Sequence, residues 1–125
     1  MSQRMRMTVI IEVDGVSVPG FPITREMSVE ESQGFTYEEA DDGNSTTFST
    51  LPTQQLATVQ VLAVTPDQAT TYRFDGQSNA GITLAAGGMI AIFNATIDAG
   101  AGSSNTSVNN NSGSTAKILG IAGGT

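Results

Sequence analysis

Residues 56–64, LATVQVLAV, decide the fold of this chain. Val59, Val61 and Ala63 alternate with the even-numbered residues, which is the period of two that a β-strand requires. Because apolar side chains occur in both sets, we expect the strand to be covered on both faces and to lie inside a sheet. The dipeptide Pro66-Asp67 that follows indicates a turn.

The same alternation extends outward in both directions from this stretch. Residues 7–13 and 16–18 flank Asp14-Gly15, a dipeptide suited to the positive φ angles of a two-residue hairpin. Further alternating runs occupy residues 27–29, 35–38, 70–75, 89–97 and 114–122. Eight to ten short strands separated by Gly, Pro and Asn turns predict an all-β protein, an antiparallel β-sandwich of the jelly-roll or Greek-key type.

The end of the chain differs from the rest in composition. Residues 99–125 carry one charged side chain, Lys117, and consist mostly of Gly, Ser, Asn, Thr and Ala. Such a composition is typical of linkers, and residues 100–105 fit a mobile loop. Residues 114–122 alternate as a strand does, so we expect them to be ordered, in the sandwich or at a contact between subunits. The predicted subunit contacts are Val108, Ile118, Leu119 and Ile121.

Length and composition exclude several classes of function. A chain of 125 residues predicts a single domain, which we place at residues 8–125, behind an N-terminal arm of residues 1–7. With no Cys and no His, the chain lacks disulfides, thiolate or imidazole metal ligands and the usual nucleophilic triads. A net charge of −7 with five basic residues excludes a nucleic-acid footprint. No run approaches the roughly 20 apolar residues of a membrane span, so we expect a soluble protein with no membrane partner.

The densest group of charges is the seven carboxylates of residues 26–42. Carboxylate oxygens are calcium ligands, but the EF-hand spacing is absent and a solvated acidic face explains the group better. A glycosidase would need two carboxyls in a cleft among aromatic side chains, and the chain has two Tyr, five Phe and no Trp. We therefore predict no metal, no cofactor and no enzymatic activity.

The first seven residues, MSQRMRM, combine arginine with methionine. They precede the first expected strand, and one interpretation is a frayed terminus. The other is an arm that contacts a neighbouring protein, because Met adapts to irregular surfaces and Arg binds carboxylates in a fork geometry. In that interpretation the contact residues are Arg4, Met5, Arg6 and Met7.

Two stretches of the second half carry a resemblance to known proteins: residues 70–100, TTYRFDGQSNAGITLAAGGMIAIFNATIDAG, and residues 107–125, SVNNNSGSTAKILGIAGGT. Their features are an aromatic strand that ends in Asp-Gly, a Gly-Gly pair before an apolar strand, and an Asn/Ser/Gly turn before the last strand. In these features the chain resembles small structural proteins of tailed bacteriophages, which include capsid decoration (cement) proteins and β-rich tail or fibre modules.

The resemblance implies a virion structural protein on the outer capsid surface, assembled in the host cytoplasm. A decoration protein would stabilise the phage head as a homotrimer that bridges subunits of the major capsid protein, with residues 1–7 as the arm that contacts the shell. The alternative is a tail or fibre module that binds a receptor or glycan through Tyr37, Tyr72 or residues 76–81.

Overall fold

The computed structural model describes residues 2–53, 56–74, 81–98 and 106–125, and within these ranges the chain forms strands and no helix. The strands are β1 (Gln3–Val9), β2 (Glu12–Val13), β3 (Val16–Ser17), β4 (Ile23–Val29), β5 (Glu31–Glu39), β6 (Ser49–Thr50), β7 (Thr58–Pro66), β8 (Thr70–Phe74), β9 (Ile82–Leu84), β10 (Ile90–Asp98), β11 (Thr106–Asn109) and β12 (Ala116–Gly124). The predicted mobile loop at residues 100–105 lies outside the described residues, and so do residues 76–80 of the glycan-binding hypothesis.

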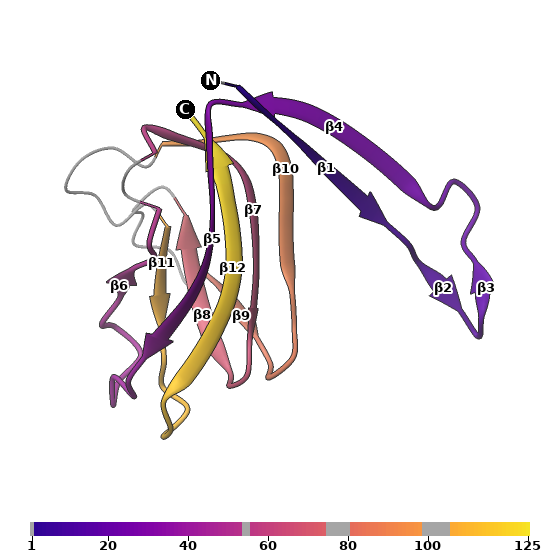
Figure 1. The fold of residues 1–125 in the computed structure, drawn as a ribbon. Helices are drawn as coiled ribbons and strands as arrows, with labels where there is room; N and C mark the ends of the chain where they lie inside the picture. The colour runs from indigo at the N-terminus through magenta and orange to yellow at the C-terminus, as the bar shows by residue number, and fades with distance from the viewer. Residues whose placement is uncertain (1, 54–55, 75–80, 99–105) are drawn as a thin grey trace.

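Strands β5 to β12 form two four-stranded antiparallel sheets that pack as layers (Figure 1). The first sheet has the order β10-β7-β12-β5, and the second has the order β6-β11-β8-β9. The chain changes sheet at every connection except the one from β8 to β9, an alternation typical of Greek-key and jelly-roll sandwiches. The predicted all-β antiparallel sandwich is confirmed.

Strand β7 contains most of the stretch LATVQVLAV and lies inside the first sheet, between β10 and β12, as its apolar faces predict. Leu62 and Val64 of this strand belong to the core between the two sheets. Tyr72 of β8 and Val108 of β11 meet them from the second sheet, and all four side chains are fully buried. Burial of such large side chains between two sheets is the main source of stability for a domain without disulfides.

The C-terminal strand β12 is ordered, as its alternation predicts, and it pairs with β5 along its full length. It pairs with β7 on its other side, so the last strand of the chain completes the centre of the first sheet. Gly120 lies where the Phe35 ring of β5 crosses the strand, and a Cβ at this position would overlap the ring. An aromatic side chain packed over a cross-strand glycine replaces the contacts that the glycine lacks.

Residues 3–29 form a long hairpin that projects from the sandwich (Figure 1). Strand β1 pairs with β4 from Gln3 opposite Val29 to Val9 opposite Ile23. Strands β2 and β3 continue the hairpin to a turn at Asp14 and Gly15, whose φ angles are 53° and 80°. The hairpin predicted at Asp14-Gly15 is confirmed, and we call residues 3–29 the arm and residues 10–18 the arm tip.

The arm is much longer than the seven residues predicted for it. Residues 3–7 lie within β1 rather than ahead of the first strand, and the β1–β4 pairing runs without interruption through residue 8. The predicted boundary between residues 7 and 8 is therefore corrected, and so is the interpretation of residues 3–7 as a frayed end. The physical reason is that a hairpin ladder, rather than a change in composition, decides where this projecting element begins and ends.

Candidate functional site

Exposed apolar side chains gather on two surfaces of the molecule. Among the described residues nine large apolar side chains are exposed, and eight of them lie on the arm or on the outer face of the first sheet. They are Val9, Ile10, Ile11, Val13, Val16, Met89, Leu119 and Ile121. The ninth, Ile82, lies on β9 of the second sheet. Clustered exposed apolar area marks sites of contact with another protein.

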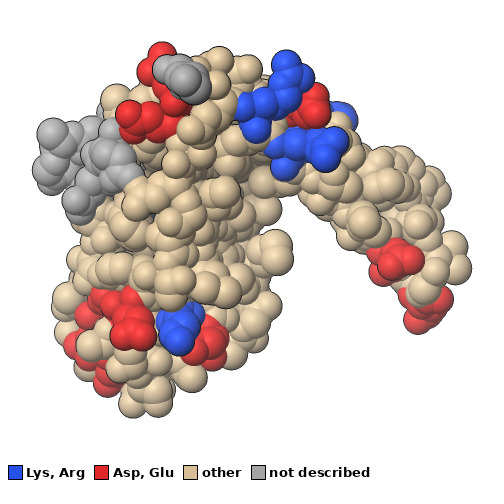
Figure 2. Space-filling view, in the orientation of Figure 1, with Lys and Arg blue, Asp and Glu red and all other residues tan. Residues whose placement is uncertain are grey.

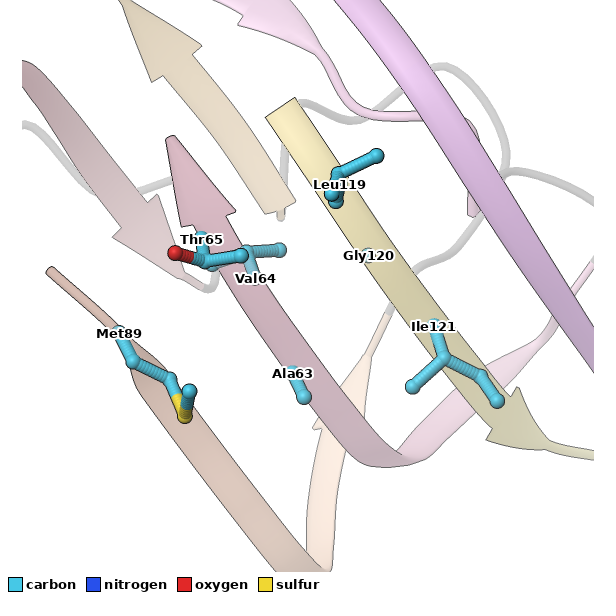
Figure 3. A pocket seen from close by; sticks show the side chains of 7 residues that line it. All are labelled: Ala63, Val64, Thr65, Met89, Leu119, Gly120 and Ile121. Carbon is cyan, nitrogen blue, oxygen red and sulfur yellow. The ribbon is translucent and has the colours of Figure 1, made fainter. Parts of the chain in front are cut away.

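The outer face of the first sheet and the arm together enclose a groove. One part, with a volume of about 350 Å³, has residues 7–10 of the arm as one wall and Ala63, Met89 and Ala91 of the first sheet as the other. A second part of about 250 Å³ continues across the sheet to Leu119 and Ile121 (Figure 3). The two parts share Ala63 and Met89, so they form one continuous depression, which we call the apolar groove.

No charged side chain lines the apolar groove within the described residues. Met89 and Leu119 are its most exposed members, at 67% and 52%. Figure 2 shows the same contrast, with uncharged surface between the arm and the body and charged side chains confined to the arm root, the arm tip and the lower end. Such a surface suits a protein partner better than a polar small molecule.

The arm has two chemically different faces, because residues directly opposite each other in a ladder project to the same side. On the inner face, Met7 lies opposite Arg25 and Met5 lies opposite Met27. The outer face is polar: Arg4 donates to a Glu26 carboxylate oxygen at 3.0 Å, and this is the one ion pair among the described residues. The arm therefore presents mostly apolar side chains to its own sheet, with Arg25 as the charged exception, and polar or charged side chains away from it.

Gly123 is the position where the arm rests on the sheet. A Cβ at Gly123 would overlap the Met5 sulfur and would lie 3.4 Å from a methyl group of Val29, a side chain that is 2% exposed. The missing side chain lets β1 and β4 pack closely on the outer face of β12. This role could not be predicted from the sequence, because Gly123 is indistinguishable there from the other glycines near the C-terminus.

Of the four predicted subunit contacts, two are buried in the core and two are exposed. Val108 and Ile118 are fully buried in the core of the sandwich, so the prediction that they contact another subunit is wrong. Leu119 and Ile121 project from the opposite face of β12 and line the apolar groove. Residues of one strand alternate between the two faces of a sheet, so neighbours in sequence receive opposite environments.

The predicted shell contacts divide in the same way. Arg4 and Arg6 are exposed on the outer face of the arm. Met5 and Met7 are half-buried on the inner face, where Met5 packs at Gly123 and Met7 lines the groove. Only the two arginines are therefore placed to meet a partner on the far side of the arm.

The acidic residues of the segment 26–42 do not converge. Glu26 belongs to the arm, Glu39 and Asp42 lie at the lower end of the sandwich, and the described residues contain no group of three or more carboxylates that could hold a metal ion. Asp42 instead accepts hydrogen bonds from the backbone N–H of Asn110, at 2.8 Å, and from the Asn109 side chain. This carboxylate ties the β5–β6 connection to the end of β11.

Glu39 is a buried carboxylate in a polar network. The hydroxyl of Tyr37 donates to one of its oxygens at 3.0 Å and the hydroxyl of Ser49 donates to the other at 2.7 Å. Burial raises the pKa of the Glu39 carboxyl, Asp42 adds to the shift, and the two donated hydrogen bonds oppose it. The network joins β5 to β6, and thus one sheet to the other.

The raised pKa of Glu39 predicts a pH-dependent component of stability. Because the folded-state pKa lies above the unfolded value, this component is present below the unfolded pKa of about 4.3 and is lost as pH rises through the folded value. We expect Glu39→Gln, which keeps a hydrogen-bonding amide, to gain stability relative to the wild type as pH rises from 4 to 7. Urea unfolding across this range measures the difference. Glu38→Gln, at an exposed neighbour, is the control, and an equal gain in that variant would contradict the assignment.

The receptor-binding alternative relied on exposed tyrosines. Tyr72 is fully buried in the core and its hydroxyl accepts a hydrogen bond from Thr70 at 2.7 Å, so its predicted role as a contact residue is wrong. Tyr37 is half-buried and donates to Glu39. The Tyr72 ring therefore has no face open to a sugar, and the Tyr37 ring packs partly against the core.

In the described part of the chain no helix is long and apolar enough to cross a membrane. Comparison with protein-family models, with curated proteins and with solved structures gives no match to this chain.

Proposed function

We propose that this protein is a structural subunit of a bacteriophage particle, a capsid decoration protein that bridges major capsid subunits as a homotrimer on the outer surface of the virion. The observation that carries the proposal is the gathering of eight exposed apolar side chains on a projecting arm and a groove. Surfaces of this kind serve binding between proteins rather than catalysis. The resemblance of residues 70–100 and 107–125 to phage structural proteins supplies the biological setting.

The mechanism in this proposal is mechanical. Arg4 and Arg6 on the outer face of the arm would pair with carboxylates of the major capsid protein, because a guanidinium binds a carboxylate through two parallel hydrogen bonds. Each contact is weak by itself. Three linked subunits bind with an avidity far above that of one subunit, and a ligand that binds only the assembled shell stabilises that shell by mass action.

The alternative, a tail or fibre module that binds a receptor or glycan, has less support because Tyr72 is buried and Tyr37 is engaged by Glu39. The two functions differ in a simple observation. A decoration protein binds assembled shells and raises their melting temperature, whereas a receptor-binding module ignores shells and retains a glycan on an array.

The test of the proposal is cosedimentation of the purified chain with expanded, genome-free shells of the phage that encodes it. We expect the wild-type chain to sediment with the shells and to raise their melting temperature. Arg4→Ala combined with Arg6→Ala should weaken this binding at least about tenfold, since each charge-assisted hydrogen bond contributes about 1.5–3 kcal/mol. The expected loss in folding stability is below about 1 kcal/mol, because the Arg4–Glu26 ion pair is exposed.

The control is Arg4→Lys combined with Arg6→Lys, which preserves both charges on the same face of the arm. It should retain part of the binding that the alanine variant loses. A wild-type chain that does not sediment with the shells would refute the shell-binding role, and glycan retention by that chain would favour the tail or fibre module.

A further inference from the structure

We propose that the apolar groove of one copy binds the arm tip of a second copy. The inference rests on the self-association in the proposed function and names the contact that produces it. The same chain displays two unmatched apolar surfaces, the groove under the arm and the tip of the arm, and each has the chemistry to cover the other.

The arm tip has one face that is apolar throughout. Val13 lies directly opposite Val16, and the ladder continues with a hydrogen bond from the N–H of Val18 to the carbonyl of Ile11 at 2.9 Å. These four side chains therefore project to one side, and Val13 and Val16 are 62% and 69% exposed. A two-stranded hairpin with an uncovered apolar face is marginally stable in water, so the arm tip needs a surface to pack on.

The groove of the same copy does not supply that surface. Residues 7–10 of the arm already form one wall of the groove, and the chain runs outward from Ile10 to the turn at Asp14. At about 3.3 Å of rise per residue, the turn lies roughly 13 Å beyond the groove wall. Figure 1 shows β2 and β3 directed away from the sandwich. The tip is placed to reach a neighbouring molecule.

Charge complementarity favours a second copy of this chain as that neighbour. The tip carries Glu12 and Asp14 without a cation near them in sequence, and neither forms an ion pair among the described residues. At the end of the groove under the arm, Arg25 projects from the same arm face as Met7 and has no ion-pair partner among the described residues. At the other end Lys117 lies opposite Glu38 on the same face of the sheet, and its backbone N–H donates to an Asp67 carboxylate oxygen at 2.7 Å, so that end is not basic. An acidic tip thus meets a groove that has a cation, Arg25, at the end under the arm, which favours this pairing and its register.

The geometry of this contact predicts how the copies assemble. The tip and the groove are different surfaces, so the contact is head-to-tail, and successive contacts close into a ring when the rotation between copies permits. In a trimer each copy donates one tip and receives one tip. Every exposed apolar cluster described above would then be covered, with Ile82 the exception.

The first experiment measures the mass of the chain in solution without shells, by sedimentation over a range of concentrations. We expect a mass three times that of the 12.9 kDa chain. A tip variant, Val13→Glu with Val16→Glu, and a groove variant, Met89→Glu with Leu119→Glu, should each be monomeric and folded, with association weakened about a hundredfold or more. All four side chains are exposed in the monomer, so these substitutions spare the core.

The second experiment mixes the two variants. The groove variant keeps an intact tip and the tip variant keeps an intact groove, so one productive contact remains and the mixture should form a 1:1 heterodimer. Tip-to-tip pairing would instead let the groove variant self-associate alone, and groove-to-groove pairing would let the tip variant do so; either result, or a mixture that stays monomeric, would overturn the inference. Ile82→Glu, at an exposed apolar residue outside both surfaces, is the matched control and should remain trimeric.

The outcomes also separate this inference from the proposed function. A wild-type chain that stays monomeric but binds shells would overturn the tip-to-groove contact and leave the shell-binding role standing. A trimer that is abolished by the tip and groove variants, yet never binds shells, would support the contact and refute the shell-binding role.

Discussion

Replacing Asn110 by alanine is expected to lower the free energy of unfolding by about 3–5 kcal/mol, because it removes four hydrogen bonds of a buried side chain, each with a net contribution of about 0.5–1.5 kcal/mol. The Asn110 side chain is fully buried and donates to the carbonyl groups of Glu39 and Ser114, at 2.8 and 2.7 Å. Its oxygen accepts from the N–H and the hydroxyl of Ser112, at 3.1 and 2.7 Å. Alanine would remove these four hydrogen bonds at the junction of β5, β11 and β12, while the Ser112 hydroxyl and the Ser114 carbonyl would keep their mutual hydrogen bond at 3.0 Å.

The control for this prediction is Asn111→Ala. Asn111 is the same residue type one position further along the same turn, and its side chain is exposed. We expect its substitution to change stability by less than about 0.5 kcal/mol. Chemical denaturation at equal protein concentration measures both variants, and similar losses in the two would show that the buried network does not hold the turn.

Strand positions could be predicted from the sequence because the signals for them are local. Alternation located β7, β10 and β12, and the Asp14-Gly15 dipeptide located the hairpin turn through its positive φ angles. The division into arm and sandwich could not be predicted in this way. Residues 7–13 alternate as clearly as residues 58–64, since an exposed hairpin and a core strand carry the same period, and only tertiary packing decides which of them is covered.

The exposed and buried faces of β12 could have been distinguished from the sequence. Lys117 marks the exposed face of this strand, and Leu119 and Ile121 share its parity, whereas Ile118 belongs with the small buried residues Ala116 and Ala122. A shift of one residue exchanges the two faces, which is why a prediction based on composition placed Ile118 in a subunit contact. The apolar groove needed the structure, because residues 7–10 meet Ala63, Met89 and Ala91 across a long sequence separation.

Both proposed contacts, to the shell and between copies, depend on how the arm packs against the first sheet. The inner face of the arm forms a wall of the groove, and the same hairpin carries the outer arginines and the tip. Gly123 holds this hairpin close to the sheet by leaving room for Met5 and Val29. A side chain at Gly123 would therefore disturb shell binding and self-association together, while the core between the two sheets stays intact.

We expect Gly123→Val to lift the arm and to reduce amide protection in β1 and β4 by about 10- to 100-fold, which corresponds to the roughly 1–3 kcal/mol of an overpacked site. The added Cβ would overlap the Met5 sulfur, and the added methyl groups would meet the buried Val29, so the hairpin is displaced. A detached hairpin is marginally stable and exchanges its amides. Hydrogen exchange followed by mass spectrometry measures the amide protection of β1 and β4, with β7 as the internal reference.

The control adds Met5→Ala to Gly123→Val, which restores space at the contact and should recover the protection. A double variant that exchanges as fast as Gly123→Val would show that Met5 is not the side chain through which the arm packs on the sheet.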